Sequence, residues 1–539
     1  MAAPSQTSSI AAPGFYGLNI QESAVSLSSG FALEAFNCVI DRYGRIGARR
    51  GWTPVNTTVN TDLGSANPVE FMFELTDNGS SQFVSAGNNK LFIGTTTMTT
   101  KTVRNAGNTG DVAYTITGNN WQAAAMPYGD GAAAEPHAYL AQAGHPTLVL
   151  HQLPQAGGNP HDHDSGTYGF QRLGDVGTIP AGYTTADFTP NCALAAYGRI
   201  WLSDIAGDPQ TVYFSRLLDG SDFQGGDSGS ISLNAVFPNT DKIIALAAHN
   251  GFLIIFGRNN IAVYANPIDV TELTLIDYIP NVGCIARDSV QNTGTDIVFL
   301  SDGGVRSLQR VIQEKSLPMR DISKNVRDDL MTNVASETAA NIKSIYYERD
   351  AFYLLSLPTT KWVYCFDMRA PLQDGSARTT IWNGIEPKAF LVTNTKELYI
   401  GKPGYIGQYF GHSDNNDAYR FQYFTNYFDF DAPTNEKIMK QIGFVVIGGA
   451  GQAIAVKWGF DYNENYFSFT KLLDTGAAYE YNVGEYNIAE FSNGIVLEKF
   501  KAQAGGRGSV LQIGLEADID GNPLSIQRID VYIKQGKQV

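Results

Sequence analysis

The amino-acid sequence predicts an all-β fold: an irregular β-propeller of six or seven blades, a C-terminal β-sandwich-like platform domain and one short amphipathic helix. The 539 residues include 55 glycines and 22 prolines, and this frequency of turn-forming residues suits many short strands and disfavours long helices. An aromatic content of 12% with only 17% charged residues indicates a folded chain rather than a disordered one. Between residues 68 and 412, β-rich runs alternate with Gly/Asn/Asp turns without a fixed motif, as expected for successive irregular blades.

The first 67 residues are expected to form an arm and a small β segment. Residues 1–14 are mostly small and polar, which predicts a flexible N-terminal arm. In residues 15–67, short β-prone stretches flank the turn Tyr43-Gly44-Arg45, so a hairpin is predicted there. We expect this segment to contribute to the platform or to the closure of the propeller.

The predicted propeller domain, residues 68–412, contains a series of hairpins. Their strands are expected at 68–75 and 82–95, 137–140 and 147–153, 191–203 and 210–215, 242–248 and 252–256, 296–301 and 305–308, 345–347 to 362–366, and 388–393 and 397–401. A pair of β-sandwiches gives similar local signals. The propeller is favoured because the hairpins repeat over a longer span than a single sandwich needs.

One segment interrupts the β pattern. Within residues 321–337, apolar side chains recur at every fourth position: Ile322, Val326, Leu330 and Val334. This spacing predicts an amphipathic helix that packs on the outside of the β-structure, with Asp321 or Ser323 as its N-cap.

Residues 413–539 are predicted to form the C-terminal all-β platform domain. Aromatic residues occupy both faces of the strand expected at 419–430, which indicates that neighbouring elements cover that strand on both sides. Further strands are expected at 438–447, 453–460, 466–473, 510–516 and 525–533.

The charge of the chain limits the partners that it can bind. With 38 Lys and Arg against 53 Asp and Glu, the net charge of −15 argues against a surface that grips nucleic acid throughout, because such binding requires neutralised phosphates. Four arginines nevertheless fall within nine residues: Arg42, Arg45, Arg49 and Arg50. They are candidates for contact with an acidic neighbouring protein, and a solvated hairpin edge is the alternative interpretation.

No catalytic residue is predicted, and the chain is not expected to be an enzyme. The tetrapeptide Gly226-Asp227-Ser228-Gly229 resembles the nucleophile loop of chymotrypsin-like proteases, but His249 follows it, whereas that fold places the histidine first. The run from Asp518 to Asn522 lacks the later ligands of a calcium loop and is interpreted as a hairpin turn. Nothing in the sequence marks two carboxylates as a glycosidase pair.

Five of the seven histidines lie close together in the sequence: His137, His145, His151, His161 and His163. The tract His161-Asp162-His163-Asp164 offers four candidate metal ligands in a loop. A polar loop tip is the simpler interpretation, because no HExxH motif and no Cys/His spacing accompanies the tract. No metal or other cofactor is therefore assigned.

The remaining signals concern the compartment. Cys38, Cys192, Cys284 and Cys365 lie far apart and suggest neither a zinc site nor a disulfide framework, so folding in a reducing cytoplasm is the simpler expectation. The first ten residues lack the pattern of a signal peptide, and no run of 18 apolar residues predicts a membrane-spanning segment.

The N-terminal residues resemble the opening of the tail nozzle proteins of short-tailed bacteriophages, also known as tail tubular proteins B or packaged-DNA stabilisation proteins. The similar stretches there are Gly17-Leu18-Asn19, Ala32-Leu33-Glu34-Ala35-Phe36-Asn37 and the residues from Asp41 to Trp52. Shorter similarities follow in the expected order at Gly144-His145-Pro146, at 212–216 with Asp222-Phe223, at 296–305 and at 424–430.

The resemblance implies a structural role. Such nozzles are hexameric rings of irregular β-propellers with β-rich platforms, which dock below the portal and adaptor, retain the packaged genome and conduct DNA during ejection. The implied partners are further copies of the chain, the adaptor, tail fibre or spike proteins, and DNA that passes through the bore without specific binding. The implied location is the virion tail, assembled in the cytoplasm of the infected bacterium. The family brings no catalytic residues.

Physical chemistry is compatible with this role, and one alternative stays open. An acidic channel repels phosphate and lets DNA slide, and a low charge fraction with many aromatic residues suits extensive subunit interfaces. The alternative is a propeller protein that binds or degrades a polysaccharide.

Overall fold

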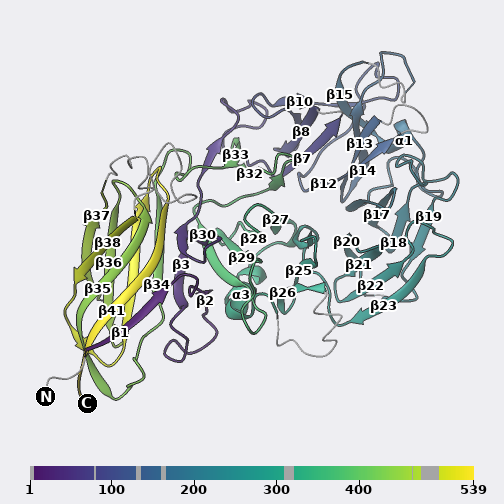
Figure 1. Ribbon diagram of the computed structural model, residues 1–539. Coiled ribbons are helices and arrows are strands. Elements are labelled where there is room, and N and C mark those ends of the chain that lie inside the picture. Colours follow the sequence, from purple (N-terminus) through teal and green to yellow (C-terminus); the bar gives the residue numbers. More distant parts are fainter. Residues whose placement is uncertain are drawn as a thin grey trace, which may run out of the picture.

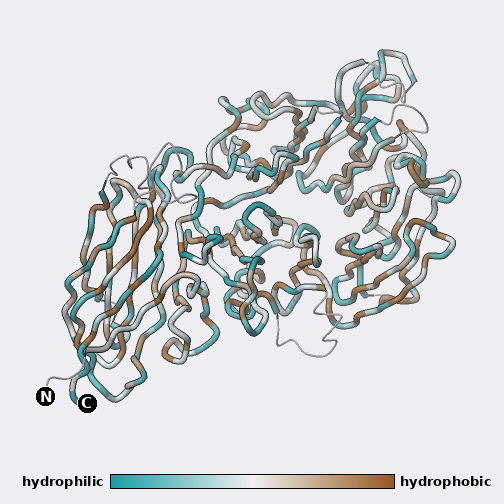
Figure 2. The backbone as a smooth tube through the Cα atoms, in the orientation of Figure 1, coloured by the Kyte–Doolittle hydropathy of each residue, from teal (hydrophilic) through white to brown (hydrophobic). Residues whose placement is uncertain are grey.

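The computed structural model describes residues 5–77, 80–128, 135–159, 165–238, 240–308, 321–463, 465–474 and 497–538. The fold is all-β, as predicted: a β-propeller lies beside a β-sandwich, and the helices are short (Figure 1). Apolar stretches follow the strands of both parts, as Figure 2 shows. No helix among the described residues has the length and apolar character to cross a membrane.

The propeller is a ring of sheets in which each blade follows the previous one along the chain. Six blades have four or five strands and a seventh, β24–β26, has three, so the predicted range of six or seven is confirmed. The first blade consists of β7 (Phe71–Asp77), β8 (Ser80–Gly87), β9 (Lys90–Ile93) and β10 (Thr99–Lys101). The second consists of β11 (Val103–Arg104), β12 (Gln122–Tyr128), β13 (Glu135–Gln142), β14 (His145–Gln152) and β15 (Tyr168–Arg172). The third consists of β16 (Cys192–Ala196), β17 (Arg199–Ile205), β18 (Asp208–Phe214) and β19 (Gly229–Ser232).

The remaining blades complete the ring, because the last inner strand contacts the first. The fourth blade consists of β20 (Ile243–His249), β21 (Phe252–Gly257), β22 (Asn260–Ala265) and β23 (Thr274–Pro280), and the fifth of β24 (Gln291–Asn292), β25 (Ile297–Ser301) and β26 (Gly304–Ser307). The sixth consists of β27 (Lys343–Tyr347), β28 (Phe352–Leu357), β29 (Trp362–Asp367) and β30 (Arg378–Asn383). The last contains β31 (Phe390–Val392), β32 (Leu398–Lys402) and β33 (Tyr405–Tyr409).

The last blade takes its outer strand from the N-terminal segment. Strand β6 (Trp52–Pro54) pairs antiparallel with β33, with Trp52 opposite Tyr409. Trp52 is buried among apolar side chains of the last two blades, including Leu398 and Ile400. Separate apolar clusters of this kind lie between neighbouring blades around the ring, so each blade is stabilised by its neighbours.

The sandwich consists of two sheets that enclose a common apolar core. One sheet contains β38 (Leu497–Gln503), β35 (Asn435–Gly448), β41 (Leu524–Gln538), β5 (Ile46–Ala48) and β4 (Cys38–Ile40), with β39 (Arg507–Gly508) and β1 (Ser5–Ala11) beside them. The other contains β34 (Tyr419–Thr425), β40 (Leu511–Ile519), β36 (Ala453–Phe460) and β37 (Phe467–Leu472). Side chains such as Phe444 and Ile513 fill the space between them.

The sandwich and the propeller share one sheet of ten strands. Strands β2 (Gly17–Leu18) and β3 (Phe31–Phe36) lie between β30 of the propeller and β34 of the sandwich. The backbone hydrogen bonds therefore run without interruption from one part of the molecule into the other, which fixes their relative position.

The predicted flexible arm is wrong for residues 5–11. These residues form β1, which pairs over its full length with β41, so that the two ends of the chain lie side by side (Figure 1). The long strand β41 offers unpaired backbone groups at this edge, and backbone hydrogen bonds need no apolar side chains. Ile10 is also buried against the sandwich core.

The predicted helix is present but shorter than expected. Helix α3 (Arg327–Ala335) follows the 3-10 turn η2 (Lys324–Val326), and the four predicted apolar positions are buried. Neither Asp321 nor Ser323 caps it, because the α-helix begins only at Arg327; the Ser323 hydroxyl instead accepts a 3.0 Å hydrogen bond from the amide of Val305. The other helical turns are α1 (Leu173–Val176), η1 (Arg287–Ser289) and η3 (Ala339–Asn341).

Candidate functional site

An arginine-lined cavity lies where the propeller meets the sandwich. Its volume is about 550 Å³, and its wall includes five arginines and two aspartates: Arg42, Arg45, Arg50, Arg349, Arg369, Asp41 and Asp350. The hairpin β4–β5 contributes the first residues, the turn before β28 contributes Arg349 and Asp350, and Ser525 of β41 closes the cavity on the sandwich side. The cavity is thus a cationic surface on an acidic chain.

Two of these arginines are neutralised within the chain. Arg45 forms a 2.6 Å ion pair with Asp41, and Arg369 forms a 2.8 Å ion pair with Asp367. Arg42, Arg50 and Arg349 form no ion pair with a carboxylate in the described ranges. Because an arginine fork binds carboxylates in a bidentate manner, these three guanidinium groups can donate hydrogen bonds to an external carboxylate.

An exposed tyrosine holds two of the arginines in place. The guanidinium carbons of Arg42 and Arg45 lie 4.8 Å and 4.5 Å from the ring centroid of Tyr43, which is itself 42% exposed. A cation above an aromatic ring is favoured by the ring quadrupole. The stacking orders these long side chains before any partner arrives, which lowers the entropy cost of binding.

Arg49 does not belong to this surface, which corrects its prediction as an interface residue. Its side chain is fully buried and donates to both carboxylate oxygens of Asp414, at 2.9 and 2.7 Å, and to the Asn37 side chain at 2.9 Å. Its guanidinium also lies 4.1 Å from the ring centroid of Tyr419. Arg49 therefore acts inside the chain, where it connects the N-terminal segment to the start of the sandwich.

His412 lies on the wall of the same cavity without adding charge at neutral pH. Burial, reinforced by the charges of Arg50 and Arg49, lowers its pKa to about 4, although a contact with the Arg49 carbonyl opposes the shift. Nδ1 of His412 lies 3.2 Å from that carbonyl oxygen. The cationic character of the cavity thus comes from its arginines.

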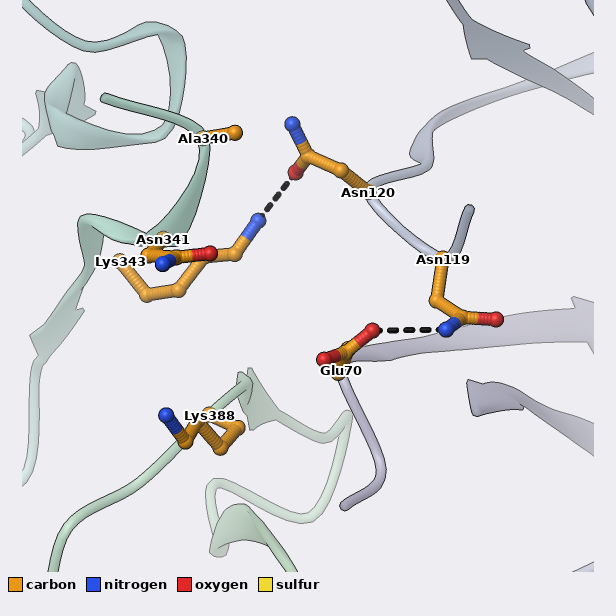
Figure 3. Close-up of a pocket in the computed structure, with 7 residues that line it drawn as sticks. All are labelled: Glu70, Asn119, Asn120, Ala340, Asn341, Lys343 and Lys388. Atoms are coloured by element: carbon orange, nitrogen blue, oxygen red, sulfur yellow. Dashed lines mark hydrogen bonds between the residues drawn. The ribbon is translucent and has the colours of Figure 1, made fainter. Parts of the chain in front are cut away.

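A second, smaller pocket of about 210 Å³ is lined by residues of four blades (Figure 3). Its wall comes from the starts of strands β7, β12, β27 and β31 and from the segments just before them, and consists of Glu70, Asn119, Asn120, Ala340, Asn341, Lys343 and Lys388. Asn119 donates a 2.7 Å hydrogen bond to Glu70, and Lys343 donates to Asn120. We call it the axial pocket.

The histidines do not form a metal site in the part of the chain that the structure describes. His161, Asp162, His163 and Asp164 lie outside the described residues. His137, His145 and His151 are buried in the second blade, where Nε2 of His151 lies 2.8 Å from Oε1 of Gln171. No group of three or more metal-ligating side chains occurs among the described residues.

The other motifs have structural roles. Asp227 forms an ion pair with the buried Arg199 on the third blade, whereas His249 ends strand β20 on the fourth. Asp520 and Asn522 belong to the turn between β40 and β41, and their backbone carbonyls accept hydrogen bonds from Gln452 at 3.1 and 3.2 Å. All four cysteines are free and buried.

Sequence reasoning missed Arg349, Arg369 and the whole axial pocket. Arg349 and Arg369 lie about 300 residues from Arg42 along the chain, and only the ring closure brings them to the same cavity. The axial residues come from four blades, and they are common residue types without a shared motif. No local spacing could have identified either group.

Comparisons with known proteins place the chain in no family. No family model matches it, and no curated protein matches it. Among solved structures, the extracellular domain of BT4673 from B. thetaiotaomicron is similar with a TM-score of 0.39 and 12% identity over 84% of this chain, which spans only 60% of that one. A glycoside hydrolase has a TM-score of 0.25 and 9% identity over 87% of this chain and 100% of its own. The Pan2 WD40 domain of Neurospora crassa has a TM-score of 0.25 and 10% identity over 70% and 89%. None of these names concerns a bacteriophage tail, and the likeness is limited to the general β-architecture.

Proposed function

We propose that this chain is a non-enzymatic structural subunit of a bacteriophage tail nozzle: a ring, hexameric by the family resemblance, that docks on the adaptor, retains the packaged genome and conducts DNA. The resemblance of short stretches along the sequence supports this role. The observation that carries the proposal is the arginine-lined cavity on a chain of net charge −15, in which Arg42, Arg50 and Arg349 have no carboxylate partner among the residues that the structure describes. Such a cavity fits a protein whose work is done through its contacts with other subunits.

The occupant that we propose for the cavity is a carboxylate-rich segment of the neighbouring copy in the ring. Because the chain is acidic overall while this cavity is cationic, the remaining surface of each copy carries the excess of carboxylates. A basic patch on one copy that meets acidic residues elsewhere on the next is a heterologous contact, and heterologous contacts build closed rings when the rotation between copies closes. Electrostatic complementarity would also select the correct partner over others.

The proposal is tested by the assembly state of the purified chain. The variant Arg42→Glu/Arg50→Glu/Arg349→Glu reverses the three unpaired charges at the protein surface. The matched control Lys90→Glu/Lys242→Glu/Lys361→Glu changes the net charge equally at exposed positions outside the cavity. Electron microscopy and analytical ultracentrifugation should show rings for the natural chain and for the control, and monomers for the cavity variant.

Two results would count against the proposal. If the natural chain stayed monomeric at high concentration, with no ring and no location in virion tails, the nozzle role would fail. If the cavity variant formed the same rings as the control, the arginines would be a solvated edge. If rings formed only in the presence of the adaptor, the adaptor rather than a second copy of the chain would be the occupant of the cavity.

A polysaccharide-binding or polysaccharide-degrading protein is the second candidate, and the axial pocket is the observation that favours it. Amide, carboxylate and ammonium groups line this pocket, and such groups bind sugar hydroxyls. Glycosidases use two carboxyl groups across the scissile bond. Since Glu70 is the one carboxylate of the pocket wall as described, the pocket favours binding over hydrolysis.

The two candidates are separated by an assay of glycan turnover. Purified chain incubated with bacterial surface polysaccharides should leave them intact if the protein is a nozzle subunit. Release of oligosaccharides that is lost in Glu70→Gln would instead establish the second candidate.

A further inference from the structure

We infer that the axial pocket binds one small hydroxylated carboxylate, of the class of the hexuronic acids. The inference goes beyond the nozzle role and does not depend on ring assembly; it rests on the groups that the pocket leaves unused. It also narrows the second candidate function to a ligand class.

Lys343 on the pocket wall belongs to an ionic network with Asp288 and Arg287, which do not themselves line the pocket. Asp288, on turn η1, forms a 2.8 Å ion pair with Arg287 and a 2.5 Å ion pair with Lys343. Arg287 also donates to Asn120 Oδ1 at 2.9 Å and to Asn191 Oδ1 at 2.9 Å. Lys343 and Arg287 are more than nine-tenths buried. Their positions are therefore set by the fold before a ligand arrives, as a preorganised site requires.

The pocket wall carries two cations, Lys343 and Lys388, and one carboxylate, Glu70. Lys343 is already paired with Asp288. Within the described part of the chain, the Lys388 ammonium has no hydrogen-bond or ion-pair partner. Lys388 lines the same pocket as Glu70 and Asn341 (Figure 3). A carboxylate bound beside the Lys388 ammonium would pair with it.

Glu70 and Asn341 add the second half of the recognition chemistry. Glu70 Oε2 accepts from Asn119 at 2.7 Å, which leaves Oε1 available, and the Asn341 amide group donates to Glu337 at 3.3 Å, which leaves its oxygen available. Both free oxygens are acceptors, so they require donors such as hydroxyl groups from the ligand. A phosphate dianion would supply only one hydroxyl donor and would bring a second negative charge towards Glu70, whereas a monoanion with several hydroxyls satisfies both kinds of group.

The volume sets the size of the ligand. The pocket, with a volume of about 210 Å³, has room for several water molecules. This is the scale of a single sugar ring rather than of an extended chain. A hexuronic acid combines that size with one carboxylate and several hydroxyl donors.

Isothermal titration calorimetry of the full chain tests the inference. The probes are D-glucuronate and D-galacturonate, with D-glucose and D-galactose as neutral counterparts and with acetate and sulfate as anions without sugar hydroxyls. We expect at least one uronate to bind at least tenfold more tightly than its neutral counterpart and than either simple anion. Lys388→Met should weaken that uronate at least tenfold, while Lys361→Met, an exposed lysine in the turn between β28 and β29, should leave its affinity unchanged.

Each contrary result overturns a defined part of the inference. Absence of binding by both uronates, or equal affinity for the neutral sugars, would reject the site as proposed. Equal affinity for acetate or sulfate would show an adventitious ion only. Unchanged uronate binding in Lys388→Met, in a variant whose melting curve matches the natural chain, would place the ligand elsewhere. Ring assembly of Lys388→Met, measured in parallel, is expected to be normal, so a failure here is distinguishable from a failure of the nozzle proposal.

Discussion

Arg49 shows how one buried side chain can determine the geometry of a large molecule. Its guanidinium joins Asn37, Asn383 and Asp414, which come from the N-terminal segment, the sixth blade and the start of the sandwich. A buried charge that is fully paired contributes little net stability compared with an apolar substitute. Removing only the arginine is costly, because the carboxylate of Asp414 then remains without its positively charged partner.

Arg49→Met should therefore destabilise the chain strongly. Leaving Asp414 without its partner is expected to lower the free energy of unfolding by about 3–5 kcal/mol, as measured by urea denaturation. Arg42→Met, at the exposed neighbouring position, should change it by less than about 1 kcal/mol. Equal effects of the two substitutions would contradict the distinction between the buried and the exposed arginine.

His412 gives a prediction about pH. Its pKa is about 4 in the folded chain and about 6.5 when unfolded, so the unfolded state binds the proton first as the pH falls. The stability contributed by the neutral imidazole is complete above pH 6.5 and is lost between pH 6.5 and 4. His412→Gln should match the natural chain at pH 7 and exceed it at pH 5 by on the order of 1–2 kcal/mol. Thermal melts of both proteins across this range provide the measurement, and a difference independent of pH would refute the assignment.

For single residues, the sequence predicts only part of what the structure shows. The sequence shows the cluster of four arginines, but it does not show that Arg49 is buried while Arg42 is exposed. That division depends on Asp414 and Tyr419, which lie more than 360 residues away and meet Arg49 only after folding. The surface arginines remain a prediction of an interface, as does the metal-ligand tract at 161–164.

At the scale of elements, the closure of the propeller depends on one strand, β6, which precedes the first blade in the sequence but pairs with the last blade. Strand β6 supplies the outer edge of the last blade, and Trp52 fills the core between the last two blades. The indole ring of Trp52 also lies 5.1 Å from the ammonium of Lys402, a mostly buried residue of strand β32 in the same blade. Closure of the ring thus combines backbone pairing with one large side chain.

Trp52→Ala should open this closure. Truncation of a buried aromatic residue is expected to cost about 3–5 kcal/mol, measured as a lower free energy of unfolding and as faster hydrogen exchange in β33. Phe410→Ala is the control, since Phe410 follows the same strand and is 60% exposed. Similar losses in both variants would show that Trp52 has no special role in the closure.

Local patterns predicted most hairpins of the blades and the apolar face of the helix, because strand alternation and helical periodicity are written in neighbouring residues. They did not predict β1. Its residues have no apolar alternation, and its pairing is determined by the free edge of β41, more than 500 residues further along. The pairing of β6 with β33 is equally non-local. An element whose stability comes from a distant partner leaves no local signal.

For the whole molecule, the ten-stranded sheet makes the propeller and the sandwich one unit. Strands β2 and β3 form backbone hydrogen bonds on both sides of the junction, and Arg49 pairs across it. We expect calorimetry to show a single unfolding transition for the natural chain. Two resolved transitions, or a stable propeller fragment after limited proteolysis, would show that the junction does not couple the two parts.

The wall of the axial pocket carries Lys343 and Lys388 beside Glu70. In the proposed role, the acidic bore for DNA is a separate feature, formed by the subunits of the ring. The proposed role then predicts that DNA transport is sensitive to exposed carboxylates on the inner surface of the ring and insensitive to Lys388.

The shared sheet also has a mechanical meaning. A load applied to the platform would pass into the sixth blade through hydrogen-bonded strands rather than through a hinge. The propeller and the sandwich would then tilt together as a rigid body. The stiffness of the connection between them would be set by β2 and β3. The shortest strand in this connection is β2, which has only the two residues Gly17 and Leu18.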